Sequence, residues 1–256
     1  MLICWNVNSI NARLSHLETV IKKFSPQILL LQETKCTDEN FPQALLEEYG
    51  YNLALSGQKS YNGVAIISKS RLEDITLALP GLHKEEARYL EASTMIAGRY
   101  TRVISVYVPN GADIESEKFT YKKQFLDLLY ARLQELKKTE ENIIIAGDFN
   151  VAPDDIDVYD AKKMAGSLCF HLEERKRFRK LLNAGLIDSF RSFNPSKQIF
   201  SWWDYRAGGW QNNKGLRIDH ILLSPAMADA VEKADILTEP RGWQKPSDHA
   251  PITIAW

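Results

Sequence analysis

The stretch Ile143–Asn150 limits the fold of this chain more than any other feature. An uninterrupted apolar run stops at Gly147, and Asp148 and Asn150 follow it. A short run that is apolar at every position predicts a buried strand, and the glycine marks the turn at its end. In an α/β sheet, the chemistry is placed where strand ends meet a crevice.

The same pattern recurs at other strand ends. Polar side chains follow the apolar runs 2–5 and 28–31 or precede the last apolar strand, 251–256, and they include Asn6, Asn8, Glu33, Asp248 and His249. Carboxylates, amides and an imidazole are the groups that bind hard cations and phosphates. Together these strand ends outline a metal and phosphate site.

The order of elements predicts the fold class. We expect strands at 1–5, 28–32, 51–56, 63–68, 89–96, 101–108, 142–147, 218–223 and 250–255, and helices at 12–24, 41–49, 116–137 and 173–184. Neighbouring strands predict hairpins beside β-helix-β units. The expected fold is therefore α/β, with two mixed β-sheets packed face to face and helices outside. No linker or repeat interrupts the chain, so one domain is expected over residues 1–256.

The composition is that of a globular protein, with 45% hydrophobic residues, 25% charged residues and a net charge of −1. A polyanion would therefore have to be held by local clusters of Lys and Arg. The three cysteines are widely spaced and form no CxxC, which fits reduced thiols and no zinc site. No run approaches the roughly 18 apolar residues of a transmembrane helix, so we expect a cytoplasmic protein without membrane contact.

Basic residues gather in two segments. The long loop 196–217 interleaves them with aromatics, a mixture that suits stacking on bases or sugars and contact with phosphates. An aromatic cluster that caps the sandwich explains its tryptophans about equally well. In helix 173–184 the Lys and Arg side chains point in several directions, so a solvated face is expected before DNA contact.

Single residues leave the chemistry open. Asp148 can orient and deprotonate water, but Asp is also a common turn residue. Glu33 suits Mg²⁺, or merely an exposed strand end. His249 can act as acid, base or oxyanion partner, with Asp219 to fix its tautomer, or it can cap a turn.

The set of motifs is more specific than its members. In chain order the motifs are Trp5-Asn6-Val7-Asn8, Leu31-Gln32-Glu33-Thr34-Lys35, Tyr107-Val108-Pro109-Asn110, Gly147-Asp148-Phe149-Asn150, Leu216-Arg217-Ile218-Asp219 and Ser247-Asp248-His249-Ala250-Pro251. Together they resemble the exonuclease III family of DNA-repair nucleases, which includes apurinic/apyrimidinic (AP) endonucleases. The resemblance implies the endonuclease/exonuclease/phosphatase fold, a four-layered α/β sandwich.

The resemblance also implies a cofactor, partners and catalytic roles. The cofactor would be Mg²⁺, with Mn²⁺ able to substitute, and the ligand set would be Glu33, Asn8, Asp248, Asp148 and Asn150. The substrate would be double-stranded DNA with damaged, recessed or blocked 3′ ends, bound by a monomer without a nucleotide cofactor. Asp148 would align and deprotonate the attacking water, and Asn150 would hold it. Whether Asp148 or His249 is the base stays open.

The remaining implied roles concern phosphate and DNA. His249, paired with Asp219, would stabilise the phosphorane-like charge, and Asn6 would grip the phosphate. Tyr107 is similar to the family's active-site tyrosine. Trp202, Leu216 and Ile218 match a small apolar pocket for a base-free sugar. The expected DNA-binding residues are Asn110, His171, Trp202, Arg206, Leu216, Arg217, Ile218 and Lys245.

Departures from the family pattern bear on specificity. Cys169-Phe170-His171-Leu172 stands where the family usually has a small residue, then Phe, then Leu or Thr, then Pro. Loss of that proline and the added His171 imidazole beside the pocket loop are expected to narrow or reshape the pocket. Asp113 stands near the place of a DNA-inserting arginine in vertebrate AP endonucleases, and Ser9 replaces a glycine. We expect intact catalysis with weakened AP-site incision, and hence a 3′–5′ exonuclease and 3′-phosphatase.

Three alternatives remain at this stage. The first is a general AP endonuclease of base excision repair whose exonuclease activity is secondary. The second is a catalytically dead DNA-binding module, which the complete set of catalytic residues disfavours. The third is a phosphodiesterase or phosphatase acting on lipids or small molecules, which the aromatic and basic loop disfavours modestly.

Overall fold

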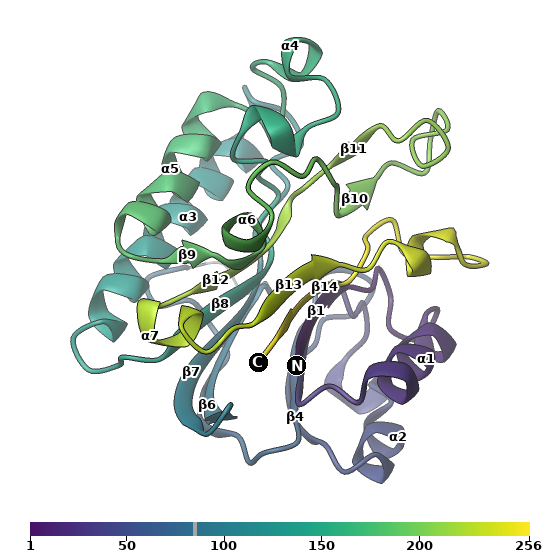
Figure 1. The fold of residues 1–256 in the computed structure, drawn as a ribbon, viewed down its shortest axis with the longest axis vertical. Coiled ribbons are helices and arrows are strands. Elements are labelled where there is room, and N and C mark those ends of the chain that lie inside the picture. The colour runs from purple at the N-terminus through teal and green to yellow at the C-terminus, as the bar shows by residue number, and fades with distance from the viewer. Residues whose placement is uncertain (84–85) are drawn as a thin grey trace.

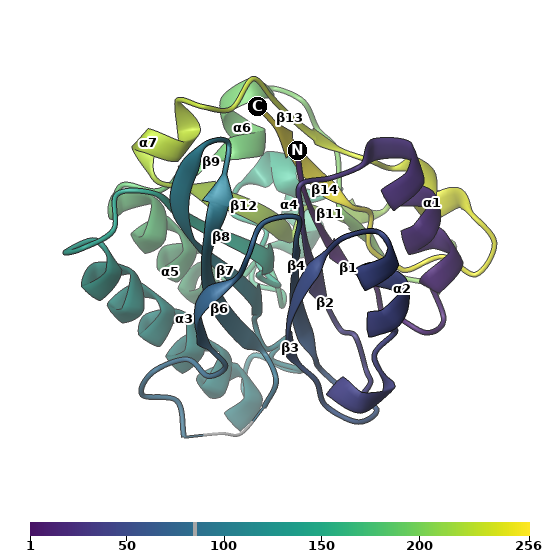
Figure 2. The same ribbon diagram turned by 90° about the horizontal axis from the view of Figure 1, so that it is seen from below.

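Two mixed β-sheets stand face to face in the middle of the molecule, and helices cover the outer side of each (Figures 1 and 2). The structure is a computed structural model that describes residues 1–83 and 86–256. The layers confirm the predicted α/β class, with helices outside two mixed sheets.

The first sheet has six strands in the order β13-β14-β1-β2-β4-β3. Their bounds are β1 Leu2–Asn6, β2 Ile28–Gln32, β3 Asn52–Ser56, β4 Val64–Ser68, β13 Lys233–Ile236 and β14 Ile252–Ala255. β1 and β2 are parallel, and the other pairs are antiparallel. Helices α1 (Leu14–Phe24) and α2 (Gln43–Glu48) cover its outer face.

The second sheet has six strands in the order β5-β6-β7-β8-β12-β9. Their bounds are β5 Glu73–Thr76, β6 Tyr89–Ile96, β7 Arg99–Tyr107, β8 Ile143–Asp148, β9 Ile187–Asp188 and β12 Asp219–Leu223. Helices α3 (Glu117–Leu136) and α5 (Leu172–Asn183) pack on its outer face. No helix of the described residues is long and apolar enough to cross a membrane.

The apolar strand runs are explained by burial on both faces. In β8, Ile144 and Ala146 point into the core between the sheets, whereas Ile143 and Ile145 pack under α3 and α5. Successive side chains of a strand alternate between faces, so both sets must be apolar. Gly147 is required for a different reason, because a Cβ there would lie 1.9 Å from the carbonyl oxygen of Val106 in β7.

The predicted strands and helices are all present, with ends shifted by up to two residues. The predicted hairpins are also confirmed, as β3–β4 and β6–β7. Several short elements were not predicted: β5, β9, β13, the pair β10 (Trp202–Trp203) and β11 (Gly215–Leu216), the helices α4 (Ala161–Met164), α6 (Ser189–Phe193) and α7 (Pro225–Ala228), and 3-10 turns at Asp38–Asn40, Asp155–Asp157 and Glu239–Gly242. Elements this short show no periodic pattern.

The topology brings the polar strand ends to one edge of the molecule. The parallel pairs β1–β2 and β7–β8 end there, and their last residues include Asn6, Tyr107 and Asp148. β12 runs antiparallel to β8, so it begins at the same edge with Asp219 opposite Asp148. β14 runs antiparallel to β1, and His249 precedes it.

Candidate active site

A buried imidazole lies between two carboxylates at this edge. The Nδ1 atom of His249 is 2.9 Å from Oδ2 of Asp219, and its Nε2 atom is 3.7 Å from Oδ2 of Asp148. All three side chains are at most 3% exposed. Asp219 is held in turn by the Ser201 hydroxyl, which donates to Oδ2 at 2.6 Å. The pairing of His249 with Asp219 that the sequence suggested is present.

Asn6 bridges the carboxylates of the two sheets. Its Nδ2 group donates to Oε1 of Glu33 at 2.8 Å and to Oδ2 of Asp148 at 2.9 Å. Both N–H donors of the carboxamide are therefore in use. The geometry places Asn6 as a spacer between two carboxylates, and its expected contact with the phosphate stays a prediction. We refer to Asn6, Glu33, Asp148, Asp219 and His249 as the carboxylate–imidazole cluster.

The cluster can hold a hard divalent cation. Ligand atoms of Glu33, Asp148 and His249 all lie within 4.8 Å of one another. The Lys35 ammonium already lies here, 2.8 Å from Oε2 of Glu33 and 2.5 Å from Oδ1 of Asn8. Two carboxylates are a usual protein contribution to a Mg²⁺ site, so the residues fit the expected metal.

The other expected ligands are engaged with neighbours. Asn8 donates to Oδ1 of Asp248 at 2.9 Å, and the Trp202 indole donates to Oδ2 of Asp248 at 3.0 Å. The Asn150 amide is engaged as well, because its Oδ1 accepts from Asn110 and its Nδ2 donates to the Val108 carbonyl, both at 3.0 Å. Lys35 stands in the quoted Glu33 motif, but no role for it was predicted.

The charges of the cluster are strongly coupled. Burial raises the pKa of Asp148 to about 7, although the neighbouring His249 opposes this. Burial alone would lower the pKa of His249, but Asp219 and then Asp148 outweigh it and raise that pKa to about 10. The imidazole is therefore a cation near neutral pH. An imidazolium fixed in a buried site can stabilise developing negative charge.

Tyr107 adds a hydroxyl donor at the end of β7. Burial, followed by the charges of Glu33 and Asp148, raises the pKa of Tyr107 well above its ordinary value. The Arg88 guanidinium stacks on the ring, 4.5 Å from its centre. The hydroxyl therefore keeps its proton and remains available as a hydrogen-bond donor.

Left-handed backbone angles occur at the site as well as elsewhere in the chain. Those at the site include φ of 45° at Asn8, 88° at Ser9, 52° at Glu33 and 51° at Asn150. Non-glycine residues adopt such angles at a cost of about 1 to 3 kcal/mol each, and they cluster at functional sites. Ser9 holds a backbone angle that glycine adopts without strain.

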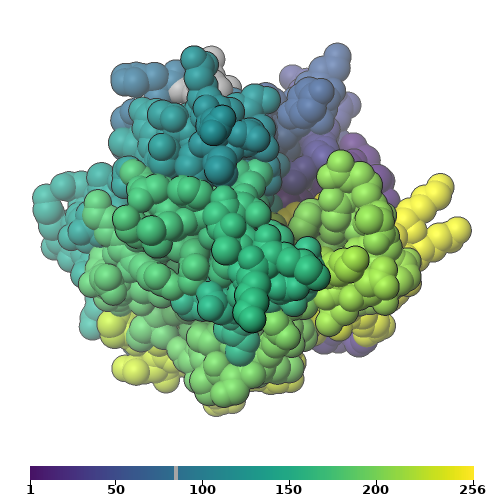
Figure 3. All heavy atoms as spheres, turned by 90° about the horizontal axis from the view of Figure 1, so that it is seen from above, coloured from purple at the N-terminus to yellow at the C-terminus, as the bar shows by residue number. Residues whose placement is uncertain are grey.

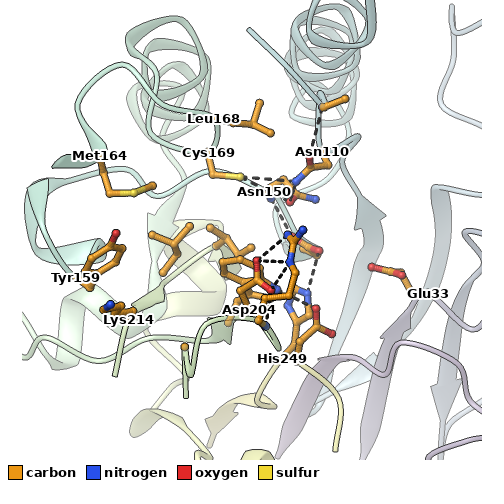
Figure 4. A pocket seen from close by; sticks show the side chains of 18 of the residues that line it. Glu33, Asn110, Asn150, Tyr159, Met164, Leu168, Cys169, Asp204, Lys214 and His249 are labelled. Carbon is orange, nitrogen blue, oxygen red and sulfur yellow. Dashed lines mark hydrogen bonds and ion pairs between the residues drawn. The ribbon is translucent and has the colours of Figure 1, made fainter. Parts of the chain in front are cut away.

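A cavity of about 650 Å³ opens beside the cluster (Figures 3 and 4). Glu33 faces it from one side, and Tyr159, Met164 and Lys214 from the other. Of the predicted residues, those that line it are Glu33, Tyr107, Asn110, Asp148, Asn150, Trp202, Arg206, Leu216, Ile218, Asp248 and His249. The hollow lies between the lime-green 200–217 region and the green and teal loops in Figure 3.

Part of this cavity is apolar. Trp202, Leu216 and Ile218 lie where the sequence predicted a small pocket, and Cys169 packs with them. Sequence reasoning did not identify Tyr159, Met164, Leu168 and Lys214 as lining residues. They lie on or beside short elements within long loops, which gave no pattern to detect. We call Tyr159, Met164, Leu168, Cys169, Trp202, Arg206, Lys214 and Leu216 the cavity wall.

The prediction that Arg217 binds DNA is wrong. Its side chain is 1% exposed, and its guanidinium binds Asp157 at 2.6 Å and Asp188 at 2.8 Å. A guanidinium so enclosed cannot meet a phosphate. The reason is strand geometry, because Leu216 and Ile218 face the cavity and the residue between them must point the other way.

The prediction that the His171 imidazole narrows the pocket is also wrong. Its Nδ1 atom accepts from the backbone N–H of Glu173 at 3.2 Å, which caps α5. The ring packs edge-on against Phe119, and it lines a second hollow rather than this cavity. Cys169 is the member of that departure that reaches the cavity. Lys245 is exposed and stands outside the lining residues.

The basic residues of α5 are neutralised within the chain. Arg175 binds the Pro153 carbonyl, Arg177 pairs with Asp127, and Arg179 pairs with Asp154. These contacts support the expectation of a solvated face. Asp113 is exposed, and its carboxylate accepts from the backbone N–H of Glu115 at 2.9 Å.

Comparisons with known proteins converge on one family. The model of the endonuclease/exonuclease/phosphatase family matches residues 3–249. Exodeoxyribonuclease III of Haemophilus influenzae is 37% identical over 263 residues, which cover 98% of this chain and 97% of that protein. The 3′ phosphatase NExo from Neisseria, solved with a product DNA hairpin, has a TM-score of 0.96, 39% identity and coverage of 100% and 98%. An AP endonuclease from Archaeoglobus fulgidus has a TM-score of 0.92, 38% identity and the same coverage.

Proposed function

This chain belongs to the endonuclease/exonuclease/phosphatase family, and from that premise we propose that it is a Mg²⁺-dependent DNA-repair nuclease working at DNA 3′ ends. It would remove nucleotides as a 3′–5′ exonuclease and remove blocking phosphates as a 3′-phosphatase. The substrate would be double-stranded DNA with damaged, recessed or blocked 3′ ends. Residues 1–256 would act as one catalytic domain, as a monomer and in the cytoplasm.

One observation carries the proposal, namely the carboxylate–imidazole cluster beside a cavity large enough for a sugar and its phosphate. Asp148 has a pKa of about 7, which suits a general base near neutral pH. His249 is a cation held by Asp219, which suits stabilisation of charge on the phosphate. This division favours Asp148 as the base and His249 as the electrostatic partner.

The metal would be held chiefly by Glu33 and Asp148. A bound divalent cation would supply charge stabilisation at the phosphate oxygens. Asn6 keeps the two carboxylates together. Asn150 is fixed beside Asp148, where its backbone N–H donates to Oδ1 of Asp148 at 2.9 Å. That bond would help to orient the carboxylate for the attacking water.

Cavity shape favours end processing over AP-site incision. The Cys169 side chain stands in the apolar part of the cavity, at a position where the family usually has a small residue. A thiol there takes space from a flipped base-free sugar. Asp113 adds an exposed negative charge on the loop before α3, which would repel a DNA backbone. Cys169 thus replaces His171 as a support for weakened incision, and Asp113 remains the other.

A general AP endonuclease is the second candidate. Trp202, Leu216 and Ile218 line the cavity as that activity would require, and the similarity to the Archaeoglobus fulgidus enzyme is nearly as high as to NExo. Behaviour on an internal abasic site separates the two candidates.

The test is a gel assay on a 5′-labelled duplex with a central abasic site and a recessed 3′ end. It is run with Mg²⁺ and with EDTA, with Asp148→Asn as the inactive control. We expect a ladder that shortens from the 3′ end, with little cutting at the abasic position. A single dominant cut at the abasic site would instead establish the AP endonuclease. No Mg²⁺-dependent product of either kind would overturn both candidates.

A further inference from the structure

A fully buried ion pair lies behind the active site, between two helices of the outer layer. Lys122 on α3 and Glu174 on α5 are both 0% exposed, and Nζ of Lys122 is 2.9 Å from Oε1 of Glu174. The ammonium also donates to the carbonyl oxygens of Asn150 at 2.7 Å and Asn110 at 3.1 Å. An ammonium has three N–H donors, so all of them are used.

The pair reaches a third loop through its carboxylate. Oε1 of Glu174 accepts from the backbone N–H of Cys169 at 3.3 Å. The three loops are those after β7, with Asn110, after β8, with Asn150, and before α5, with Cys169. All three line the cavity, and they lie close together in Figure 4. One buried pair therefore holds the backbone of three loops that meet at the site.

The loops need such support. Asn150 and Cys169 have left-handed φ angles of 51° and 65°. Their side chains form one chain of contacts with Asn110, whose Nδ2 donates to Oδ1 of Asn150 at 3.0 Å. Strained backbones persist only where the surroundings hold them, and hydrogen bonds from a buried ammonium are strong enough to do so.

We propose that Lys122 and Glu174 are a positioning pair that fixes the Asn110 and Asn150 amides for the reaction. The proposal rests on the proposed phosphoester hydrolysis. Stability alone does not explain the pair, because well-packed apolar side chains stabilise a core at least as well as a buried ion pair. Apolar side chains cannot bind two carbonyl oxygens and a backbone N–H.

The same helix offers a matched control. Arg132 lies ten residues further along α3, about 15 Å away at 1.5 Å per residue. It binds Glu91, which is 0% exposed, with Nη2 at 2.6 Å from Oε1 and Nε at 3.0 Å from Oε2. Neither Arg132 nor Glu91 lines the cavity. Loss of this pair should therefore weaken the fold without moving the site.

The experiment compares Lys122→Met with Arg132→Met. Thermal melting is measured for both, together with kcat and KM for phosphate release from a 3′-phosphate duplex with Mg²⁺. We expect both variants to melt at lower temperature. Lys122→Met should lower kcat about 10- to 100-fold, since a displacement near 1 Å can cost about that much, with KM little changed. Arg132→Met should keep the wild-type kcat.

A second variant, Glu174→Gln, keeps the proposal testable if Lys122→Met does not fold. Glu174→Gln keeps an oxygen that can accept from both Lys122 and Cys169, so its kcat should fall less than that of Lys122→Met and more than that of Arg132→Met. If Lys122→Met does not fold, the comparison of Glu174→Gln with Arg132→Met decides. Equal kcat in the site and control variants, or an effect confined to KM, overturns the positioning role. An inactive wild type would overturn the proposed function itself.

Discussion

The carboxylate–imidazole cluster and the cavity wall are built in opposite ways. Members of the cluster stand at strand ends and bind one another, and Asn6, Asp148, Asp219 and His249 are at most 3% exposed. The wall comes from long loops, and several of its side chains are exposed, such as Arg206 at 87%. The difference indicates that strands determine the chemistry and loops determine which DNA reaches it.

The division has a physical basis. A residue at the end of a strand within a sheet is held in place by the hydrogen bonds to the strands on both sides. Asp148 is held in this way between β7 and β12. Wall residues in loops can change without disturbing those ladders. Changes to the cluster should therefore lower turnover on every substrate, whereas changes to the wall should alter the ratio between substrates.

The largest effect is expected for Asp148→Asn. The variant keeps the shape but loses the carboxylate that we propose aligns and deprotonates water, so kcat should fall by roughly 10³-fold, at the scale of lost general-base catalysis. The loss should be the same for 3′-phosphate release and for nucleotide removal. Both rates are measured by gel assay at saturating DNA. Asp229→Asn, on the exposed end of α7, is the control. A fall in kcat on only one of the two substrates would contradict the proposed division between the cluster and the cavity wall.

The next largest effect concerns stability, at Arg217. Arg217→Met removes the guanidinium from the buried Asp188 and leaves the buried Asp157 with Arg191 alone, which should cost about 3 to 5 kcal/mol of unfolding free energy. Urea unfolding measures it. Arg206→Met, at an exposed site in the same loop, is the control and should cost little. Equal free energies of unfolding for the two variants would contradict a structural role of Arg217 and would group it with the cavity wall.

The ion pair of Arg217 with Asp188 also predicts that the stability of the fold depends on pH. Burial alone would raise the pKa of Asp188, but Arg217 outweighs it and holds that pKa below its ordinary value. A depressed folded-state pKa contributes stability above the unfolded pKa of about 4, and this contribution is lost as the pH falls further. The wild type should therefore melt at lower temperature below about pH 4. Arg217→Met should lack this contribution already at neutral pH and show a flatter acid profile.

The sequence predicted the cluster better than the wall, for reasons visible in single residues. Asp148 and Glu33 come shortly after runs that are apolar at every position. These runs predict buried strands, so the position of both carboxylates at the edge of a sheet could be predicted as well. Arg217 was predicted to bind DNA as part of the motif Leu216-Arg217-Ile218-Asp219, but it alternates with Leu216 and Ile218 and therefore points away from the cavity. Lys122 lay on the apolar stripe of α3, three residues before Phe125, and that position already indicated a buried lysine. The cap at His171 depended on where α5 begins, which local pattern does not determine.

A smaller effect, on specificity, is expected at Cys169. Its φ of 65° suits glycine, so Cys169→Gly should fold well and open the apolar part of the cavity. One small group in such a pocket is worth about tenfold or more in discrimination. We expect AP-site incision to rise about that much relative to 3′-phosphate release. His171→Gly is the matched control, since that ring caps α5 outside the cavity, and it should leave the ratio unchanged. The reverse result would restore the imidazole as the determinant.

The smallest effect is expected at Arg206. Its guanidinium is held only by Asp204, with Nη2 at 2.8 Å from Oδ2, and it lines the cavity mouth. If it meets one DNA phosphate, Arg206→Ala should raise KM severalfold and reduce the salt dependence of binding by about one phosphate contact. kcat should stay unchanged, because the cluster is untouched. Lys138→Ala, at the far end of α3, should alter neither value. A fall in kcat without a change in KM would mean that the cavity wall also affects the chemical step. The proposed division, in which strand ends determine turnover and loops determine substrate choice, would then be wrong.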